Sequence, residues 1–328
     1  MLVESHRFKS TSLLGKLAKA VNEVDKDNAK DIDNWFEKDG FISEITDGES
    51  LFSTDEKTEV SSVFIKDKSR SGLKSLSSLI TKKSLEFFCN EGEYLSKLKS
   101  NEFVVKNDKD AKVIFDLLNH YRILCANRNG PLGTVEINKK VNTDVQALLR
   151  GAKSLNLRYD PEDFYPGKVI LITKNDSFLN VDNGDVGFVA FDSDEAKEEN
   201  RLKVFFTPKD KSASDDENFK EVRRISPERL SDYESGFAMT IHKSQGSEYS
   251  YVCMVLCATY NPVLTKELIY TGLTRAKSKD KFDKDNKTIT VGGKVSIITD
   301  KELFKECVVK RVHRESGLSV MLREGTES

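Results

Sequence analysis

Residues 236–277 read GFAMTIHKSQGSEYSYVCMVLCATYNPVLTKELIYTGLTRAK and hold the most informative pattern in the chain. A short apolar run that can enter a sheet leads into a polar loop at residues 240–248. Residues 251–257 are almost wholly apolar, which predicts a strand covered on both faces. A helix is expected over residues 265–277, with Arg275 on a face other than its apolar stripe. A polar loop beside a buried strand, followed by a helix that presents an arginine, is typical of sites at the strand ends of α/β folds.

Two motifs in this stretch resemble motifs V and VI of superfamily 1 helicases: TIHKSQGSE at residues 240–248 and YTGLTRAK at residues 270–277. They are most similar to the RecD group, the alpha subunit of exodeoxyribonuclease V, whose members move 5′ to 3′ on single-stranded DNA. The pattern RILCANRNGPLG at residues 122–133 is a second likeness to RecD chains, and SHRF at residues 5–8 resembles motif IV. The resemblance covers nearly the whole chain and is weakest over residues 25–110.

The resemblance implies that this chain completes an ATP site. In such motors an arginine brought across the cleft stabilises the negative charge on the transferred phosphoryl group, an effect worth roughly 10³ to 10⁵ in rate. Arg275 matches the arginine of motif VI and is the leading candidate for this catalytic role, with Arg7 of motif IV as the second. Glu248 of motif V would bind the ribose hydroxyls. The nucleotide-binding residues that the resemblance implies are Arg7, Gln245, Gly246, Glu248 and Arg275.

Small hydrogen-bond donors and a cation gather in the loop at residues 240–248. Groups of this kind hold phosphate and sugar without reading base sequence. In a RecA-like fold, the loop after a strand such as residues 121–126 also faces the nucleic acid. The resemblance therefore implies DNA contacts by Arg128, Asn129, Asn138, Thr240, His242, Lys243 and Ser244. Two simpler interpretations stay open: Arg128 and Asn129 only shape a turn, and His242 is packed in the core.

The resemblance implies an α/β architecture: a RecA-like parallel sheet flanked by helices, helicase lobe 2A, with a small inserted SH3-like β-barrel, module 2B. Short β-like runs alternate there with polar turns such as DNGD at residues 182–185. The apolar run at residues 167–173 is assigned to the α/β part. The expected divisions are residues 1–174 for the first part of lobe 2A, 175–235 for the barrel, and 236–328 for the second part of lobe 2A with motifs V and VI.

Composition limits the classes of function. The 328 residues are enough for one large domain or two small ones. A formal net charge of −2 argues against a protein that coats nucleic acid through bulk charge, although it leaves room for a local basic groove. Cysteines and histidines form no metal-ligand pattern, free thiols indicate a reducing compartment, and no apolar run approaches a membrane span. Together with the resemblance, these features predict a bacterial cytoplasmic protein with no metal site of its own and no membrane partner.

The phosphate-binding loop of such motors, GxxxxGK[ST], is absent from the sequence. We therefore expect that loop and the Mg²⁺ ligands on an N-terminal RecA-like lobe, so that ATP with Mg²⁺ is hydrolysed only when that lobe is present. This chain alone should then be inactive in hydrolysis. The other expected partners are single-stranded DNA and the remaining subunits of an exodeoxyribonuclease V complex, acting in DNA repair and recombination.

Two other functions stay open. One is a stand-alone module that binds single-stranded DNA or docks on a partner without motor activity. Retention of Arg7, Glu248 and Arg275 counts against it, because a binding module needs no nucleotide-facing residues. The other is a different superfamily 1B motor, of relaxase or Dda-like type. The pattern at residues 122–133 favours RecD over these, whereas the fold alone would not separate them.

Overall fold

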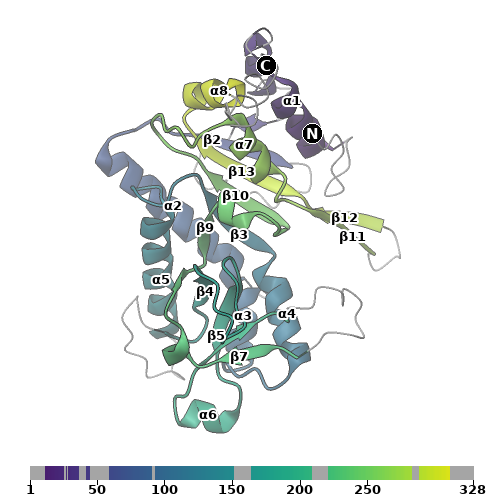
Figure 1. Ribbon diagram of the computed structural model, residues 1–328. Helices are drawn as coiled ribbons and strands as arrows, with labels where there is room; N and C mark the ends of the chain where they lie inside the picture. Colours follow the sequence, from purple (N-terminus) through teal and green to yellow (C-terminus); the bar gives the residue numbers. More distant parts are fainter. Residues whose placement is uncertain are drawn as a thin grey trace, which may run out of the picture.

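The computed structural model describes residues 12–25, 27, 29–36, 42–44, 59–90, 93–150, 164–208, 221–282 and 288–310. Within them the chain forms a six-stranded sheet, a five-stranded sheet and a two-stranded hairpin (Figure 1). Helices flank the six-stranded sheet, and the five-stranded sheet lies at the other end of the molecule (Figure 1).

The six-stranded sheet has the order β1-β2-β13-β10-β3-β9, and every neighbouring pair in it runs parallel. Val252 and Met254 of β10 face one hydrophobic core. Cys253 and Val255, the alternate residues, face a second core. A strand covered on both faces needs a continuous apolar run, as predicted for this segment. The strands are β1 (Ser43–Glu44), β2 (Val60–Phe64), β3 (Tyr121–Cys125), β9 (Ala238–Thr240), β10 (Tyr251–Val255) and β13 (Lys294–Thr299).

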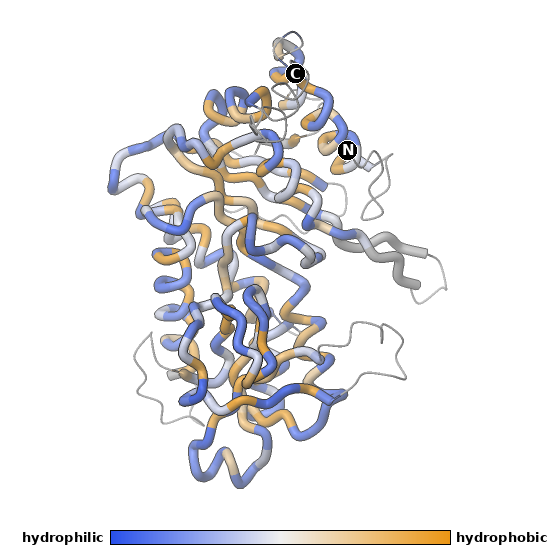
Figure 2. The backbone as a smooth tube through the Cα atoms, in the orientation of Figure 1, coloured by the Kyte–Doolittle hydropathy of each residue, from blue (hydrophilic) through white to orange (hydrophobic). Residues whose placement is uncertain are grey.

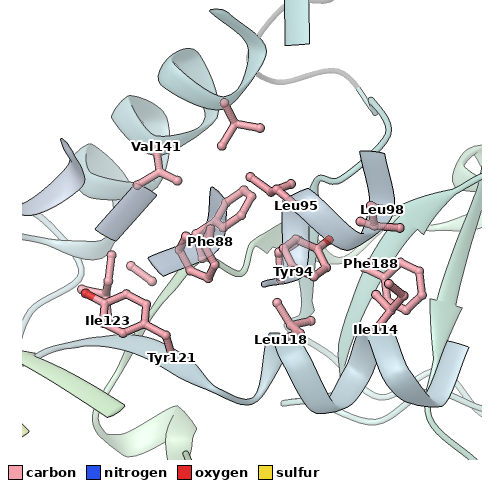
Figure 3. Close-up of a cluster of buried hydrophobic side chains, with 14 of the residues drawn as sticks. Phe88, Tyr94, Leu95, Leu98, Ile114, Leu118, Tyr121, Ile123, Val141 and Phe188 are labelled. Carbon is pink, nitrogen blue, oxygen red and sulfur yellow. The ribbon is translucent and has the colours of Figure 1, made fainter. Parts of the chain in front are cut away.

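A group of helices covers each face of this sheet. The core that contains Val252 is closed by α1 (Leu13–Glu23), α7 (Lys266–Leu273), α8 (Lys301–Val309) and the 3₁₀ helix η1 (Ala29–Phe36). The core that contains Cys253 is closed by α2 (Arg70–Cys89), α3 (Tyr94–Ser100), α4 (Asp108–Leu118) and α5 (Thr134–Arg150). Aromatic rings fill this second core, where Phe88, Tyr94 and Tyr121 lie together (Figure 3).

Helix α7 is shorter than predicted. It begins where the Thr265 hydroxyl accepts a hydrogen bond from the N–H of Leu268 at 3.3 Å. After residue 273 the backbone pairs with Tyr249 instead: the N–H of Tyr249 donates to the carbonyl of Arg275 at 2.9 Å, and the N–H of Lys277 donates to the carbonyl of Tyr249 at 2.8 Å. These pairings replace further helical bonds, so the arginine lies beyond the helix and not on one of its faces.

The five-stranded sheet is antiparallel, with the order β7-β6-β5-β4-β8. Its first strand, β4, is the apolar run that we expected in the α/β part, and it pairs with β5 and β8. The expected edge at residue 175 is therefore too late, because the sheet begins with β4. The elements are β4 (Val169–Ile172), β5 (Val186–Ala190), α6 (Asp194–Glu198), β6 (Lys203–Phe206), β7 (Arg223–Ile225), the 3₁₀ helix η2 (Pro227–Arg229) and β8 (Tyr233–Ser235).

The two sheets share one core. Phe188 of β5 stacks on Phe205 of β6, with ring centroids 5.1 Å apart. The same ring lies 4.9 Å from Phe115 of α4 and 6.4 Å from Tyr94 of α3. Because these helices also close one core of the parallel sheet, buried aromatic contacts anchor the antiparallel sheet to the lobe (Figure 3).

A hairpin of β11 (Ser278–Phe282) and β12 (Thr288–Gly292) projects from the parallel sheet (Figure 1). Hydrophobic segments follow the strands of the parallel sheet, whereas α6 and its flanking turns are hydrophilic (Figure 2). Among the described residues, every helix is too short or too polar to cross a membrane.

Replacing Phe188 by alanine should destabilise both sheets together. The free energy of unfolding is expected to fall by about 3–5 kcal/mol, because a fully buried ring leaves the shared core. Urea unfolding followed by the fluorescence of Trp35, which is buried in the opposite core, would measure this loss. The matched control is Phe178→Ala, since Phe178 follows β4 but is 86% exposed. If the midpoint of the Trp35 transition falls no further in Phe188→Ala than in the control, the two sheets do not share one core.

Candidate nucleotide and nucleic-acid site

Two loops come together where β3 and β9 end. The two strands are parallel neighbours with Cys125 opposite Thr240, so the chain leaves both at the same edge of the sheet. The N–H of Ile241 still donates to the carbonyl of Cys125 at 2.9 Å. The loop at residues 127–133 therefore lies beside the loop at residues 241–248.

Side chains from α5 hold the chain as it enters β9. The amide nitrogen of Asn138 donates to the carbonyls of Ser235 at 2.7 Å and Ala238 at 2.8 Å. Its amide oxygen accepts from the N–H of Ala238 at 2.8 Å. Asn142 donates to the hydroxyl of Ser235 at 2.7 Å. The predicted DNA contact by Asn138 is wrong, because this amide is buried and is bonded to the backbone of the strand.

Arg122 holds the same junction from within β3. Its side chain is fully buried and donates to the carbonyl of Gly236 and, at 3.3 Å, to the carbonyl of Leu118. The guanidinium carbon lies 5.1 Å from the centroid of the Tyr249 ring. Burial lowers the pKa of Arg122, which is the cost of removing a cation from water. The sequence offers one signal for this residue, a charge within an apolar run, and no role for Arg122 follows from the motifs.

The exposed side of the loop at residues 241–248 is formed by His242, Gln245 and Gly246. The packed-core interpretation of His242 is therefore wrong. Gly246 has φ +88, in the left-handed region that favours glycine, and no atom lies within 4 Å of the position that a Cβ would take. These three positions face open space and are accessible to a ligand.

The inner side of the same loop is structural. Ser244 is fully buried, and its hydroxyl donates to the carbonyl of Ile241 at 2.7 Å. The predicted DNA contact by Ser244 is wrong, because this hydroxyl closes the turn on itself. Thr240 is half-buried, and its hydroxyl accepts from the N–H of Lys243 at 3.3 Å.

The loop at residues 127–133 exposes Arg128 and Asn129 on a tightly folded backbone. A Cβ placed on Gly133 would lie 2.5 Å from the carbonyl oxygen of Arg128, so only glycine allows the chain to fold back this closely. The backbone of these residues shapes the turn, and their side chains remain accessible.

A carboxylate that belongs to none of the sequence motifs joins the two loops. Glu234 of β8 lies 2.6 Å from the ammonium of Lys243 and 3.2 Å from the guanidinium of Arg128. The Glu234 side chain is 18% exposed, whereas that of Arg128 is 65% exposed. Two of the predicted DNA-contacting cations thus share one acidic partner, supplied by the antiparallel sheet.

Arg275 is buried between the two motifs. It is 6% exposed, and its Nε donates to the carbonyl of Thr271 at 3.0 Å. One terminal nitrogen donates to the carbonyls of Ser247 at 3.2 Å and Ser244 at 3.4 Å. The other donates to the hydroxyl of Thr274 at 3.1 Å. The guanidinium therefore bonds directly to the backbone of the loop at residues 241–248.

Glu248 and Lys277 strengthen this connection with an ion pair of 2.6 Å. Both side chains are about one-third exposed, so the pair lies at the surface of the lobe. Together with the backbone pairing around Tyr249, it fixes the end of the motif V loop against the end of motif VI. Arg7 lies outside the described residues.

These positions define the class of protein. A parallel-sheet lobe presents cations and small polar groups at its strand ends, and a buried arginine joins that loop to a second motif. The family model for the UvrD-like helicase C-terminal domain matches residues 235–279, which contain β9, the loop and α7. The chain is therefore helicase-like in the segment that forms the site.

Relatives identify the family within this class. The RecBCD enzyme subunit RecD of Haemophilus influenzae is 28% identical over 323 residues, which are 98% of this chain and 41% of that protein. The ATP-dependent RecD2 DNA helicase of Deinococcus radiodurans is 32% identical over 158 residues, which are 48% of this chain and 19% of that protein. This chain is related to the RecD helicases, as its motifs predicted. It spans less than half the length of either relative.

A solved structure is also similar, although weakly. The Pif1 helicase from Bacteroides, in complex with ADP-AlF3 and single-stranded DNA, is 16% identical over 80% of this chain and 55% of its own. Its TM-score of 0.30 is too low to support an argument about the fold.

Asn138→Ala should cost about 1–3 kcal/mol of unfolding free energy, because the buried N–H and carbonyl of Ala238 would lose their partner. Asn129→Ala is the matched control, since Asn129 is exposed and should change stability by less than about 0.5 kcal/mol. Urea unfolding of both variants measures the difference. Equal stability of the two would show that the Asn138 amide does not hold β9.

Proposed function

We propose that this chain is the second motor lobe of an ATP-dependent 5′–3′ DNA helicase of RecD type. The observation that carries the proposal is the bonding of Arg275 to the loop at residues 241–248. In this proposal one side of that loop would hold nucleic acid, and the other side is bonded to Arg275 of the motif that would face nucleotide. A motor needs such a connection, because each hydrolysis event has to change the grip on the strand.

On the nucleic-acid side, the proposed contacts are Thr240, His242, Lys243, Arg128 and Asn129. Each side chain is exposed or half-buried, and all come from the last residue of β9 or from the two loops that follow β3 and β9. They offer hydroxyl, amide, imidazole and cationic groups, which suit phosphate and sugar and carry no base-specific pattern. This lobe would hold a single strand regardless of sequence.

On the nucleotide side, Glu248 would bind the ribose hydroxyls and Arg275 the phosphates, with Gln245 and Gly246 beside them and Arg7 as a second cation. The residues fit a nucleotide in part. The Glu248 carboxylate is partly exposed, and the backbone at Gly246 is open. The proposal assigns the phosphate loop and the Mg²⁺ ligands to an N-terminal RecA-like lobe, because the motif GxxxxGK[ST] does not occur in this sequence.

Arg275 would act by moving. The acceptors that hold Arg275 include the carbonyls of Thr271, Ser244 and Ser247 and the hydroxyl of Thr274, and these four groups are neutral. A phosphate brought in by the other lobe would attract the guanidinium more strongly than these groups do, because a charge-assisted hydrogen bond is roughly twice as strong as a neutral one. Withdrawal of Arg275 from Ser244 and Ser247 would release the loop that holds the strand.

The remaining parts of the proposal follow from the family. The antiparallel sheet would be the SH3-like module 2B, beginning with β4. The partners would be single-stranded DNA, the lobe with the phosphate loop, and the other subunits of an exodeoxyribonuclease V complex. The process served would be DNA repair and recombination in the bacterial cytoplasm. Without the other lobe this chain would hydrolyse no ATP.

One observation favours a second function, a stand-alone module that binds single-stranded DNA. Arg275 has its hydrogen-bonding groups satisfied without nucleotide, as a purely structural arginine would. The two functions differ in what Arg275 does for hydrolysis in the full-length protein.

Arg275→Ala should lower DNA-stimulated ATP hydrolysis by at least about 10³-fold in a full-length protein that contains the phosphate loop, because the transferred phosphoryl group loses its cation. Turnover is measured by phosphate release with and without oligo-dT. Arg275→Lys keeps the positive charge but lacks the guanidinium, so it separates the effect of losing the charge from the effect of losing the guanidinium geometry. Arg201→Ala, which removes a half-exposed arginine from the antiparallel sheet region, is the control. Turnover of Arg275→Ala close to that of the control would leave the stand-alone module as the better account.

Glu234→Gln should tighten the binding of single-stranded DNA about fivefold, the equivalent of roughly 1 kcal/mol. The carboxylate competes with DNA phosphates for Lys243 and Arg128, and the amide does so much less. Fluorescence anisotropy with labelled oligo-dT measures the affinity. Asp232→Asn makes the same charge change two residues away, at an exposed position. An affinity of Glu234→Gln no higher than that of Asp232→Asn would mean that these cations do not bind the strand.

A further inference from the structure

A second polar groove opens between α2 and α5, outside the motifs of the family. Its cavity volume is about 660 Å³. Residues of α2 form one wall and residues of α5 form the other. Nothing in the proposed motor cycle uses this groove.

The groove is basic in a chain whose net charge is −2. Arg70 and Lys74 line it from α2, and Lys139 and Lys140 line it from α5. Across the described residues, none of these four cations forms an ion pair. The lining carboxylates, Glu136 and Asp144, are outnumbered two to one. Four cations against two carboxylates around one cavity create a positive potential that attracts polyanions.

The cations are spread along the groove. Arg70 and Lys74 are four residues apart, which places them about 6 Å apart along one face of α2. The hydroxyls of Ser77 and Ser78 continue the same wall by one further turn. A single phosphate would engage one turn of this wall, whereas a chain of phosphates would engage successive turns.

The groove is continuous with the loop at residues 127–133. Gly130 and Pro131 of that loop line the cavity, directly after Arg128 and Asn129, which are proposed to hold the strand. No aromatic side chain is among the lining residues, so the groove offers no surface on which a base could stack. Its chemistry fits the sugar-phosphate backbone of a single strand.

We infer that the groove between α2 and α5 is a backbone-binding extension of the proposed DNA site. A single strand that crosses the loop at residues 127–133 continues between the two helices, where lysine and arginine neutralise its phosphates. This inference rests on the proposed function, because it needs a strand at that loop. It adds a site and a longer footprint on the DNA.

The test is the salt dependence of oligo-dT binding by the full-length protein without nucleotide. Lys74→Gln with Lys139→Gln removes one cation from each wall, and both side chains are exposed. For an oligonucleotide of about 20 residues, the slope of log K against log salt should become shallower by about 1.4, since each phosphate contact on a single strand contributes about 0.7. A short oligonucleotide of about 5 residues, which covers only the loops, should bind the variant and the wild type alike.

The control is Lys82→Gln with Lys109→Gln, which removes two exposed lysines that do not line the cavity. If the groove variant and the control have the same slope on the long oligonucleotide, the groove does not bind the DNA backbone. The proposed function would still stand. Equal losses on the short and long oligonucleotides would also overturn it, because the effect would then be one of overall charge. A wild-type protein that binds neither oligonucleotide would overturn both proposals. A variant that loses affinity for polyglutamate but not for oligo-dT would assign the groove to an acidic polypeptide instead.

Discussion

The site depends on how the three-residue edge strand β9 is held. An edge strand pairs with a neighbour on one side only, which leaves the backbone groups on its other side without partners from the sheet. In this protein the amide of Asn138 bonds to both the N–H and the carbonyl of Ala238, so a side chain takes the place of a further strand. Arg122 binds the carbonyl of Gly236 immediately before β9. We call these bonds from Asn138 and Arg122 the clamp. The loop at residues 241–248 begins where β9 ends, so the clamp sets the position of the loop.

The same clamp lies where the two sheets meet along the chain. Strand β8 ends at Ser235, and β9 begins at Ala238 in the other sheet. Asn138 reaches both sides of this crossing, since it bonds to Ser235 and to Ala238, and Asn142 adds a second bond to Ser235. A displacement of the antiparallel sheet would therefore be transmitted to β9, and through Glu234 to the two loops. The shared aromatic core around Phe188 opposes such a displacement, because moving the sheet would break its ring contacts.

Sequence reasoning located the elements and the motifs, because these are properties of local pattern. The apolar run of β10 and the family motifs could be read directly. The role of Asn138 could not be predicted in this way. An asparagine that contacts DNA and one that bonds to a strand 100 residues away look the same in sequence. The apolar run of β4 predicted a strand without saying which sheet it joins. Arg275 was expected on a helix face because the pairing of Tyr249 with its carbonyl is non-local. Glu234 had no local signal, and its importance arises only when two distant cations meet it.

The loop at residues 241–248 is proposed to serve both the strand and the nucleotide. Amide hydrogen exchange of the full-length protein, with oligo-dT or a non-hydrolysable ATP analogue added separately, is the sharpest test of this double role. DNA should slow exchange at residues 127–133 and 241–244. The analogue should slow exchange at residues 245–249 and 271–277, and α8 should be unchanged by either ligand. If exchange at residues 241–249 responds to neither ligand, the loop does not have this double role.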